Sequence, residues 1–262
     1  MHTFLVVPTG FGVGLTSISL GLVRALELAG LRVGFCKPIA QQHDGDSGPE
    51  RSSELIERTH GLKSPKPLDR AYFERRLGDG QLDDLLEEII NLHQEAGVGH
   101  DVVIVEGMVQ TRQASYAGQV NLHLAKSLDA EVILVSAAES ASLSELFDRI
   151  EILMQMFGGA KAPKVLGVIL NKVRFPEAVA AFTHSLTALA SLQEGTPLRL
   201  LGSIPWQAQL TAPRTRDVAE LLGAQVLNAG EYEQRRVQQI VLCARAVPNT
   251  VQLLKPGVLV VT

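Results

Sequence analysis

The stretch PTGFGVGLTS near the N-terminus contains residue types that can hold a phosphate group. Its three glycines permit positive φ angles, so backbone N–H groups can come close to a ligand. The hydroxyls of Thr16 and Ser17 suit a phosphate oxygen or Mg²⁺. A helix expected to begin near Thr16 directs the positive end of its dipole at the same place. The stretch therefore predicts an anion-binding turn, whose glycines are Gly10, Gly12 and Gly14.

This turn departs from the usual phosphate-binding loop in two ways. The usual loop reads G-x-x-x-x-G-K-[ST], and its lysine reaches the β- and γ-phosphates. Here three residues separate Gly10 from Gly14, and Leu15 stands where the lysine is needed. Without that cation, the charge of a terminal phosphate is poorly compensated. A tight strand-to-helix turn that binds nothing accounts for the stretch equally well.

Lys37 directly follows the apolar run of residues 32–36, and Pro38 turns the chain there. If the run is a strand next to the glycine turn, Lys37 points into the same crevice. It would then supply the cation that Leu15 does not. A solvated lysine is the alternative.

Glu106 ends the apolar run of residues 101–106. A carboxylate at a strand end beside a phosphate loop commonly holds Mg²⁺, directly or through water. Thr16 and Glu106 are therefore candidate magnesium ligands. An acid paired with a nearby lysine or arginine is the alternative.

Residues suited to a nucleotide base follow two later apolar runs. The amide of Asn171 offers both a donor and an acceptor to a purine edge. Pro205 and Trp206 could form an apolar wall for a base. Each signal is weak alone, since asparagine at a strand end is often a turn residue. Arg112 lies on the loop after Glu106.

These residues need elements that bring them together, and short apolar runs alternate with longer amphipathic ones. The alternation predicts an α/β fold with a mainly parallel sheet and helices on both faces, in which ligands bind at the carboxyl ends of the strands. The strand of residues 4–7 is expected between two others, and the Asp- and Gly-rich loop of residues 41–48 is expected to be mobile. The expected strands are residues 4–7, 32–36, 101–106, 131–136, 165–171 and 199–204. The expected helices are residues 16–29, 50–59, 81–96, 119–127, 143–157, 177–192 and 214–222.

The composition is that of a globular protein, with 262 residues, 46% of them hydrophobic, and a net charge of −4. The mild acidity gives no indication of nucleic acid or a membrane surface as a partner. No apolar run approaches the roughly 18 residues of a spanning helix, and no charged region precedes the first apolar stretch, so we expect neither membrane insertion nor a secretory signal. Cys36 and Cys243 are expected as buried thiols in a reducing cytoplasm, and His93 and His100 as solvated surface residues.

Taken together, the strand ends resemble the dethiobiotin synthetase-like group of phosphate-loop proteins. That group has a glycine loop, then K-P, E-G, N-x-V and finally I-P. The counterparts are residues 10–16, 37–38, 106–107, 171–173 and 204–205. Five motifs in one order are far more specific than any one of them.

A closer resemblance spans essentially the whole chain. The segments PTGFGVGLTSISLGLVRALE, FCKPIAQ, VIVEGMVQTR, FGGAK, GVILNKV, LGSIPW and LNAGEYEQRRVQQIVLCAR resemble the N-terminal region of long-form bacterial phosphate acetyltransferase. The same short loop, with leucine in place of lysine, occurs in that family. The resemblance therefore implies that Leu15 is a family trait rather than damage.

The resemblance implies that residues 1–223 form a dethiobiotin synthetase-like domain. It implies that residues 224–262 are a linker and the incomplete start of a domain named for a D-R-T-G-G motif. The motif itself is absent from this sequence. Long-form phosphate acetyltransferases interconvert acetyl-CoA plus phosphate with acetyl phosphate plus CoA in a C-terminal domain. The chain is thus expected to be a fragment with a regulatory and assembly role, with CoA bound only through the missing domain. No acetyl-transfer residue can be named, and other copies of itself are its expected partners. We also expect the tail after about residue 223 to be poorly ordered or packed against a neighbouring chain.

Two other functions remain open. One is an ATP-dependent ligase of the dethiobiotin synthetase or cobyrinic acid amidase kind, against which the missing lysine and the shortened loop argue. The other is a pure interaction module, since the expected helix at residues 143–157 has an apolar stripe that could meet another subunit. We expect the loop to hold an anion or a weakly bound nucleotide, with or without Mg²⁺, but not to hydrolyse ATP efficiently.

Overall fold

The structure is a computed structural model that describes residues 1–41, 50–112, 114–138, 143–158, 164–175, 179–185, 198–243 and 251–262. The chain divides into two compact units, Met1–Pro205 and Trp206–Thr262. This division lies before the boundary expected near residue 223. The reason is helix α9 (Thr215–Leu222), whose first turn is tied to the later chain by Thr215 N donating to Arg235 O and Arg216 N donating to Tyr232 O. The two units are described separately.

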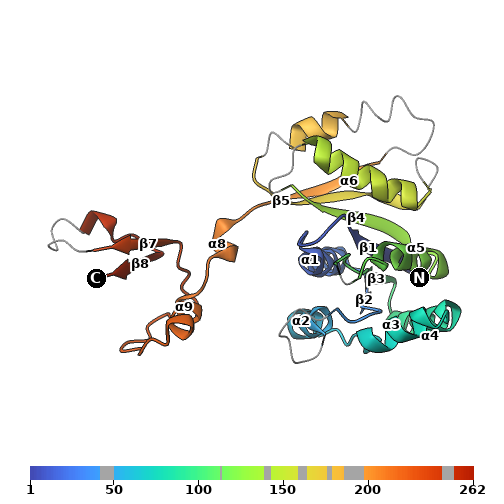
Figure 1. The fold of residues 1–262 in the computed structure, drawn as a ribbon, viewed down its shortest axis with the longest axis horizontal. Helices are drawn as coiled ribbons and strands as arrows, with labels where there is room; N and C mark the ends of the chain where they lie inside the picture. The colour runs from blue at the N-terminus through green and yellow to red at the C-terminus, as the bar shows by residue number, and fades with distance from the viewer. Residues whose placement is uncertain are drawn as a thin grey trace. The chain divides into compact units, whose positions relative to one another are not determined.

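The first unit is built on a parallel sheet in the order β2-β3-β1-β4-β5-β6 (Figure 1). Every pairing between neighbouring strands of this sheet is parallel. The strand at the N-terminus, β1, lies between β3 and β4, as predicted. All six expected strands are present: β1 (His2–Pro8), β2 (Val33–Cys36), β3 (Val102–Glu106), β4 (Glu131–Ala137), β5 (Val165–Val173) and β6 (Leu200–Pro205).

Helices connect these strands and cover both faces of the sheet (Figure 1). The sequence analysis missed α3, because of its nine residues only Phe73 is buried and the apolar pattern is correspondingly weak. The helix expected at residues 177–192 falls partly outside the described residues, of which 179–185 are helical, and the loop at 42–48 lies outside them. Besides residues 179–185, the helices described in this unit are α1 (Leu15–Leu28), α2 (Arg51–His60), α3 (Arg70–Gly78), α4 (Leu82–Gly97), α5 (Ala117–Ser127) and α6 (Leu143–Met156).

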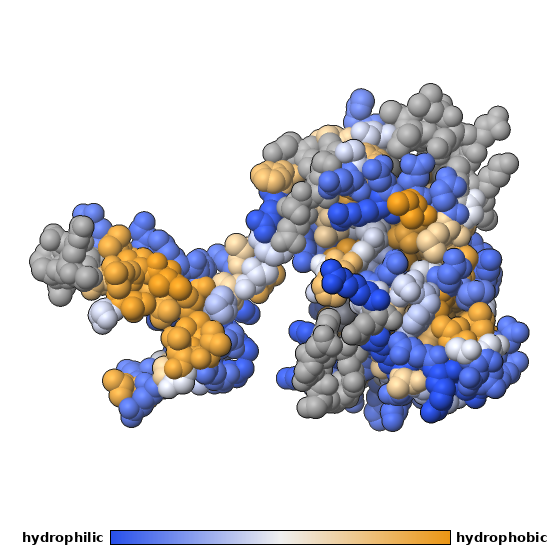
Figure 2. Space-filling model, in the orientation of Figure 1, coloured by the Kyte–Doolittle hydropathy of each residue, from blue (hydrophilic) through white to orange (hydrophobic). Residues whose placement is uncertain are grey.

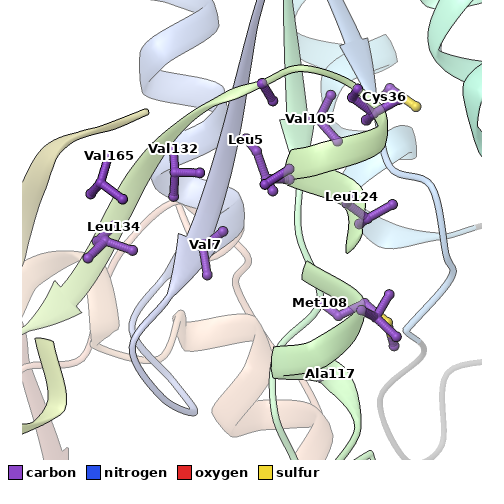
Figure 3. Close-up of a cluster of buried hydrophobic side chains, with 14 of the residues drawn as sticks. Leu5, Val7, Cys36, Val105, Met108, Ala117, Leu124, Val132, Leu134 and Val165 are labelled. Carbon is purple, nitrogen blue, oxygen red and sulfur yellow. The ribbon is translucent and has the colours of Figure 1, made fainter. Parts of the chain in front are cut away.

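Each face of the sheet has its own hydrophobic core, because successive side chains of a strand point to opposite faces. Leu5 and Val7 of β1 belong to the core packed against α3, α4, α5 and α6 (Figure 3). Val6, between them, belongs to the core packed against α1 and α2. The strands are therefore apolar at consecutive positions, which is why they lack two-residue alternation. This double covering fixes α1 and α2 on one face and α3 on the other.

The expectation that His93 is a solvated surface residue was wrong. His93 is 7% exposed and shares a hydrogen bond of 2.9 Å between its Nε2 and Thr3 Oγ1, because it continues the buried face of α4 that Leu85 and Ile89 begin. His100 is half-buried, with its Nδ1 2.8 Å from Ala96 O.

Of the two free thiols, Cys36 is buried, as expected, and burial raises its pKa to about 12. Cys243 is only half-buried, because it follows an exposed strand of the small second unit. Within the described residues, no helix has both the length and the apolar character needed to cross a membrane.

The second unit pairs two strands in parallel, β7 (Gln239–Leu242) and β8 (Val258–Val261). It also contains α8 (Ala208–Thr211), α9 and a short 3₁₀ helix, Val251–Leu253. Hydrophobic residues gather on its surface (Figure 2), including Ile240 and Leu242, which are 67% and 71% exposed. The apolar runs of residues 237–243 and 258–262 in the expected tail thus each contain a strand. Whether a neighbouring chain covers them stays a prediction.

Candidate functional site

A pocket of about 320 Å³ lies at the carboxyl ends of β2 and β3, beside the loop after β1 and the first turns of α1, α2 and α3. Its volume is at the lower end of the range of small-molecule sites. Six of the nine candidate residues line it: Gly12, Gly14, Thr16, Ser17, Lys37 and Glu106. The candidates named from the sequence are therefore six of the 18 residues that line the pocket.

The glycine loop has the backbone form that the sequence predicted. Gly12 and Gly14 have φ angles of 71° and 81°, in the region that favours glycine. Gly14 is also the N-cap residue of α1, and no side chain among the described residues caps this helix. The backbone N–H groups of its first turn therefore lack the side-chain partner that most helices provide. These N–H groups lie at the pocket wall and are suited to an anion.

Asn171 stabilises this loop through a side-chain hydrogen bond. Its Nδ2 donates to Val13 O at 2.8 Å, and its Oδ1 accepts from Lys172 N at 2.9 Å. A Cβ atom on Gly14 would lie 2.5 Å from Asn171 Nδ2, so close contact is a second reason for glycine there. Asn171 does not line the pocket in the described structure. Its predicted contact with a purine edge stays a prediction.

Leu15 occupies the position of the usual loop lysine and packs into the core. It is 4% exposed and belongs to the hydrophobic cluster on the α1 face, together with Ile18 and Val33. The leucine therefore anchors the start of α1. The pocket must obtain its cations from elsewhere in the chain.

Lys37 and Glu106 form a buried ion pair at the base of the pocket. Lys37 Nζ lies 3.1 Å from Glu106 Oε1, and both side chains are 2% exposed. Lys37 Nζ also donates to Gly107 O at 2.9 Å. The alternative of a solvated lysine was wrong, whereas the alternative of Glu106 paired with a nearby cation describes the geometry. The pair places one positive and one negative charge under the glycine loop.

Two hydroxyls complete the surroundings of one oxygen of Glu106. Ser52 Oγ donates to Glu106 Oε1 at 2.8 Å, and Thr16 Oγ1 donates to the same oxygen at 3.4 Å. The two hydroxyl oxygens are 3.0 Å apart. The other oxygen, Glu106 Oε2, is buried and has no hydrogen-bond partner among the described residues. A buried acceptor without a partner is rare and is a natural ligand for a cation or a donor.

This donor set fits Mg²⁺ only in company with a phosphate. Mg²⁺ is commonly held by one or two carboxylates together with substrate phosphates and water. Thr16 and Glu106 provide a hydroxyl and one carboxylate oxygen without a described partner, but Lys37 already neutralises that carboxylate, and their role as magnesium ligands stays a prediction. The described residues contain no group of three or more His, Cys, Asp or Glu that could hold a metal on their own.

Several polar residues of the pocket were not among the candidates from the sequence, and Ser52 and Arg70 are two of them. Each lies in the first turn of a helix capped by an acidic residue. Glu50 accepts from Ser53 N and caps α2, and Asp69 accepts from Tyr72 N and caps α3. The capping pattern marks both helix starts, but only the packing of α2 and α3 brings these starts to the pocket.

The remaining candidates lie outside the pocket wall. Gly10 precedes the lining residues of the loop, and Pro205 is exposed at the end of β6. Arg112 is exposed on the loop after β3. Trp206 belongs to the second unit. The apolar wall expected from Pro205 and Trp206 therefore stays a prediction.

The glycine loop, the parallel sheet and the paired strand-end residues define a phosphate-loop NTPase-like domain. The family model described as AAA domain matches residues 2–214, and the chain belongs to this family. A second model, described as DRTGG domain, matches residues 217–262.

The relatives of this chain include phosphate acetyltransferases. The protein of that name from Pseudomonas aeruginosa is 70% identical over all of this chain, and those from Pseudomonas putida and Nitrosomonas europaea are 68% and 56% identical. The chain spans 38% of the length of each of these three relatives. The resemblance to the N-terminal region of phosphate acetyltransferases, inferred from the motifs, is confirmed. Among solved structures, a McdA–ATP complex from Cyanothece is 18% identical, with a TM-score of 0.46 over 87% of this chain and 98% of that one.

Proposed function

We propose that this chain is the regulatory and assembly region of a phosphate acetyltransferase, and that its glycine-loop pocket binds the phosphate group of a regulatory ligand. The parent reaction would interconvert acetyl-CoA plus phosphate with acetyl phosphate plus CoA in a part of the protein outside this chain. Identity of 70% to a phosphate acetyltransferase over 38% of its length supports the assignment.

One observation carries the proposal of a ligand. Glu106 Oε2 is buried without a partner in the described structure, next to the uncapped N-terminus of α1. The buried carboxylate oxygen needs a cation or a hydrogen-bond donor, whereas the helix N-terminus favours an anion. A phosphate that brings Mg²⁺ satisfies both at once. Thr16 and Glu106 would hold the ion, and the ion would neutralise phosphate charge.

We further propose that the pocket does not hydrolyse ATP efficiently. The lysine that normally reaches the terminal phosphates is replaced by Leu15, which packs in the core. Lys37 is engaged by Glu106 and by Gly107 O. Removing one charged donor from a transition state typically costs about 3 kcal/mol, or roughly a hundredfold in rate. A ligand would therefore bind and dissociate more often than it reacts.

The regulatory role is tested in a full-length protein that carries this region. Acetyl phosphate formation is measured with and without ATP, in the intact protein and after deletion of residues 1–205. We expect the deletion to preserve acetyl transfer and to abolish the response to ATP. Acetyl phosphate formation by the present chain alone would contradict the assignment. ATP-dependent ligation of a carboxylic acid by this chain would favour the ligase alternative.

The assembly role and the location are parts of the same proposal. Other copies of the chain are the proposed partners, and sedimentation of the full-length protein before and after the deletion measures their contribution. A loss of oligomeric state on deletion is expected, and an unchanged state would contradict the role. The free thiol of Cys36 supports a reducing cytoplasm as the location.

A further inference from the structure

We propose that Arg70 replaces the missing loop lysine as the ligand cation of the pocket, so that the pocket takes a chain of two or more phosphates rather than a single phosphate. The inference rests on the proposed phosphate-binding function. It adds a second anion position and names the class of ligand. The first position is the glycine loop at the N-terminus of α1.

The cations that line the pocket differ in how available they are. Lys37, Arg51 and Arg70 are the basic residues in the described wall. Lys37 is 2% exposed and committed to Glu106 and Gly107 O. Arg51 is exposed at the start of α2, where water competes with any ligand. Arg70, with 28% of its side chain exposed, is accessible and yet partly desolvated.

Arg70 is also held in one orientation. Its Nε donates to Glu74 Oε1 at 2.8 Å, one helical turn later. Tyr116, the N-cap residue of α5, donates its OH to the same oxygen at 2.8 Å and so fixes the carboxylate. These two partners hold the pKa of Glu74 below its usual value, which keeps the carboxylate ionised beside the guanidinium. A pre-organised guanidinium offers a planar fork of donors that matches a phosphate in a bidentate manner.

Arg70 approaches the pocket from the opposite side of the sheet from the glycine loop. α1 packs in the core of one face with Ile18 and Val23, whereas α3 packs in the core of the other face through Phe73. The loop N–H groups and the Arg70 guanidinium therefore meet at the carboxyl edge of the sheet from two sides. A ligand with two linked anionic groups could place one at the loop and the other at Arg70. A diphosphate unit is the simplest ligand of this kind.

The experiment compares phosphate with pyrophosphate on the whole chain. Titration calorimetry measures the affinity of inorganic phosphate and of pyrophosphate, each with Mg²⁺ at constant ionic strength. The proteins are wild type, Arg70→Gln, Arg70→Lys and the matched control Arg51→Gln, which removes an exposed charge from the same wall. Thermal unfolding of each variant verifies that the fold is retained.

We expect the wild type to bind pyrophosphate at least about tenfold more tightly than phosphate, since a charged hydrogen bond contributes about this factor. Arg70→Gln should weaken pyrophosphate binding about tenfold and leave phosphate binding within twofold. Arg70→Lys should recover part of the loss, because it restores the charge without the fork. Arg51→Gln should change both affinities by less than about threefold.

The two proposals fail in different ways. If the wild type binds phosphate but shows no preference for pyrophosphate, the second anion position is wrong and the phosphate site stands. Equal weakening of both ligands by Arg70→Gln, or no weakening, also overturns the role of Arg70. If the wild type binds neither ligand, the proposed phosphate-binding function fails, and this inference fails with it.

Discussion

The buried pair of Lys37 and Glu106 offers a quantitative prediction about stability. At 3.1 Å and an effective dielectric constant of about 20, two unit charges attract by about 5 kcal/mol. Both side chains are 2% exposed, so water does not weaken this attraction as it does at the surface. Desolvation of the two charges offsets most of it in the native state. The pair should therefore add little net stability, whereas breaking it should be costly.

Lys37→Met removes the cation and leaves Glu106, among the described residues, with only the hydroxyls of Ser52 and Thr16. We expect this change to lower the free energy of unfolding by about 3–5 kcal/mol, because a buried charge loses its partner. Glu106→Gln should cost a similar amount for the same reason. The double variant removes both charges, and it should lose no more than about 1 kcal/mol relative to wild type.

Urea unfolding followed by circular dichroism measures the free energies of unfolding of the wild type and the three variants, and a double-mutant cycle gives the coupling. The exposed pair of Arg58 and Glu54 on α2, 3.5 Å apart, is the matched control. Arg58→Met should cost less than about 1 kcal/mol. The reasoning is refuted if the double variant loses as much as the two single variants together, or if each single loss is below about 1 kcal/mol.

Three further predictions concern single positions. Burial lowers the pKa of His93, so its neutral form is favoured in the folded state. The free energy of unfolding should therefore fall as the pH drops below about 6.5, whereas that of His93→Gln should not show this pH-dependent fall. Gly14→Ala forces a Cβ to within 2.5 Å of Asn171 Nδ2 at a φ of 81°, and should lower the free energy of unfolding in urea by about 1–3 kcal/mol. The control Gly21→Ala, which lies in open space within α1, should be neutral or stabilising. Leu15→Lys should lower the free energy of unfolding by more than about 2 kcal/mol, because Leu15 is part of the core. ATP turnover of this variant should stay at the wild-type level, and restored turnover would mean that the site is a disabled enzyme.

The sheet was predictable because its strands are continuous apolar runs covered on both faces. The run at residues 4–7 enters the glycine loop directly, which places it beside the ligand crevice and inside the sheet. Strand ends of a parallel sheet share one edge, so Lys37 and Glu106 could be expected to lie close together. Their 3.1 Å pair follows from this topology.

What the sequence did not predict depends on how helices pack. Ser52 and Arg70 are ordinary polar residues at helix starts, and only the positions of α2 and α3 on opposite faces bring them to one pocket. α3 itself buries only Phe73, so its helical pattern is weak. His93 was assigned to the surface because histidine is a polar residue type. Its position, eight residues after Leu85, places it on the buried face of α4.

The central claim is that the pocket binds a phosphate ligand without hydrolysing it efficiently. The most direct test measures MgATP binding and ATP turnover in the same sample of this chain. The account predicts saturable binding, weakened when Arg70 is replaced by glutamine, with turnover at least a hundredfold below ordinary enzyme rates of about 10 per second. Turnover at about 10 per second would contradict the regulatory role. Absence of any MgATP binding at millimolar concentration would contradict the phosphate site itself.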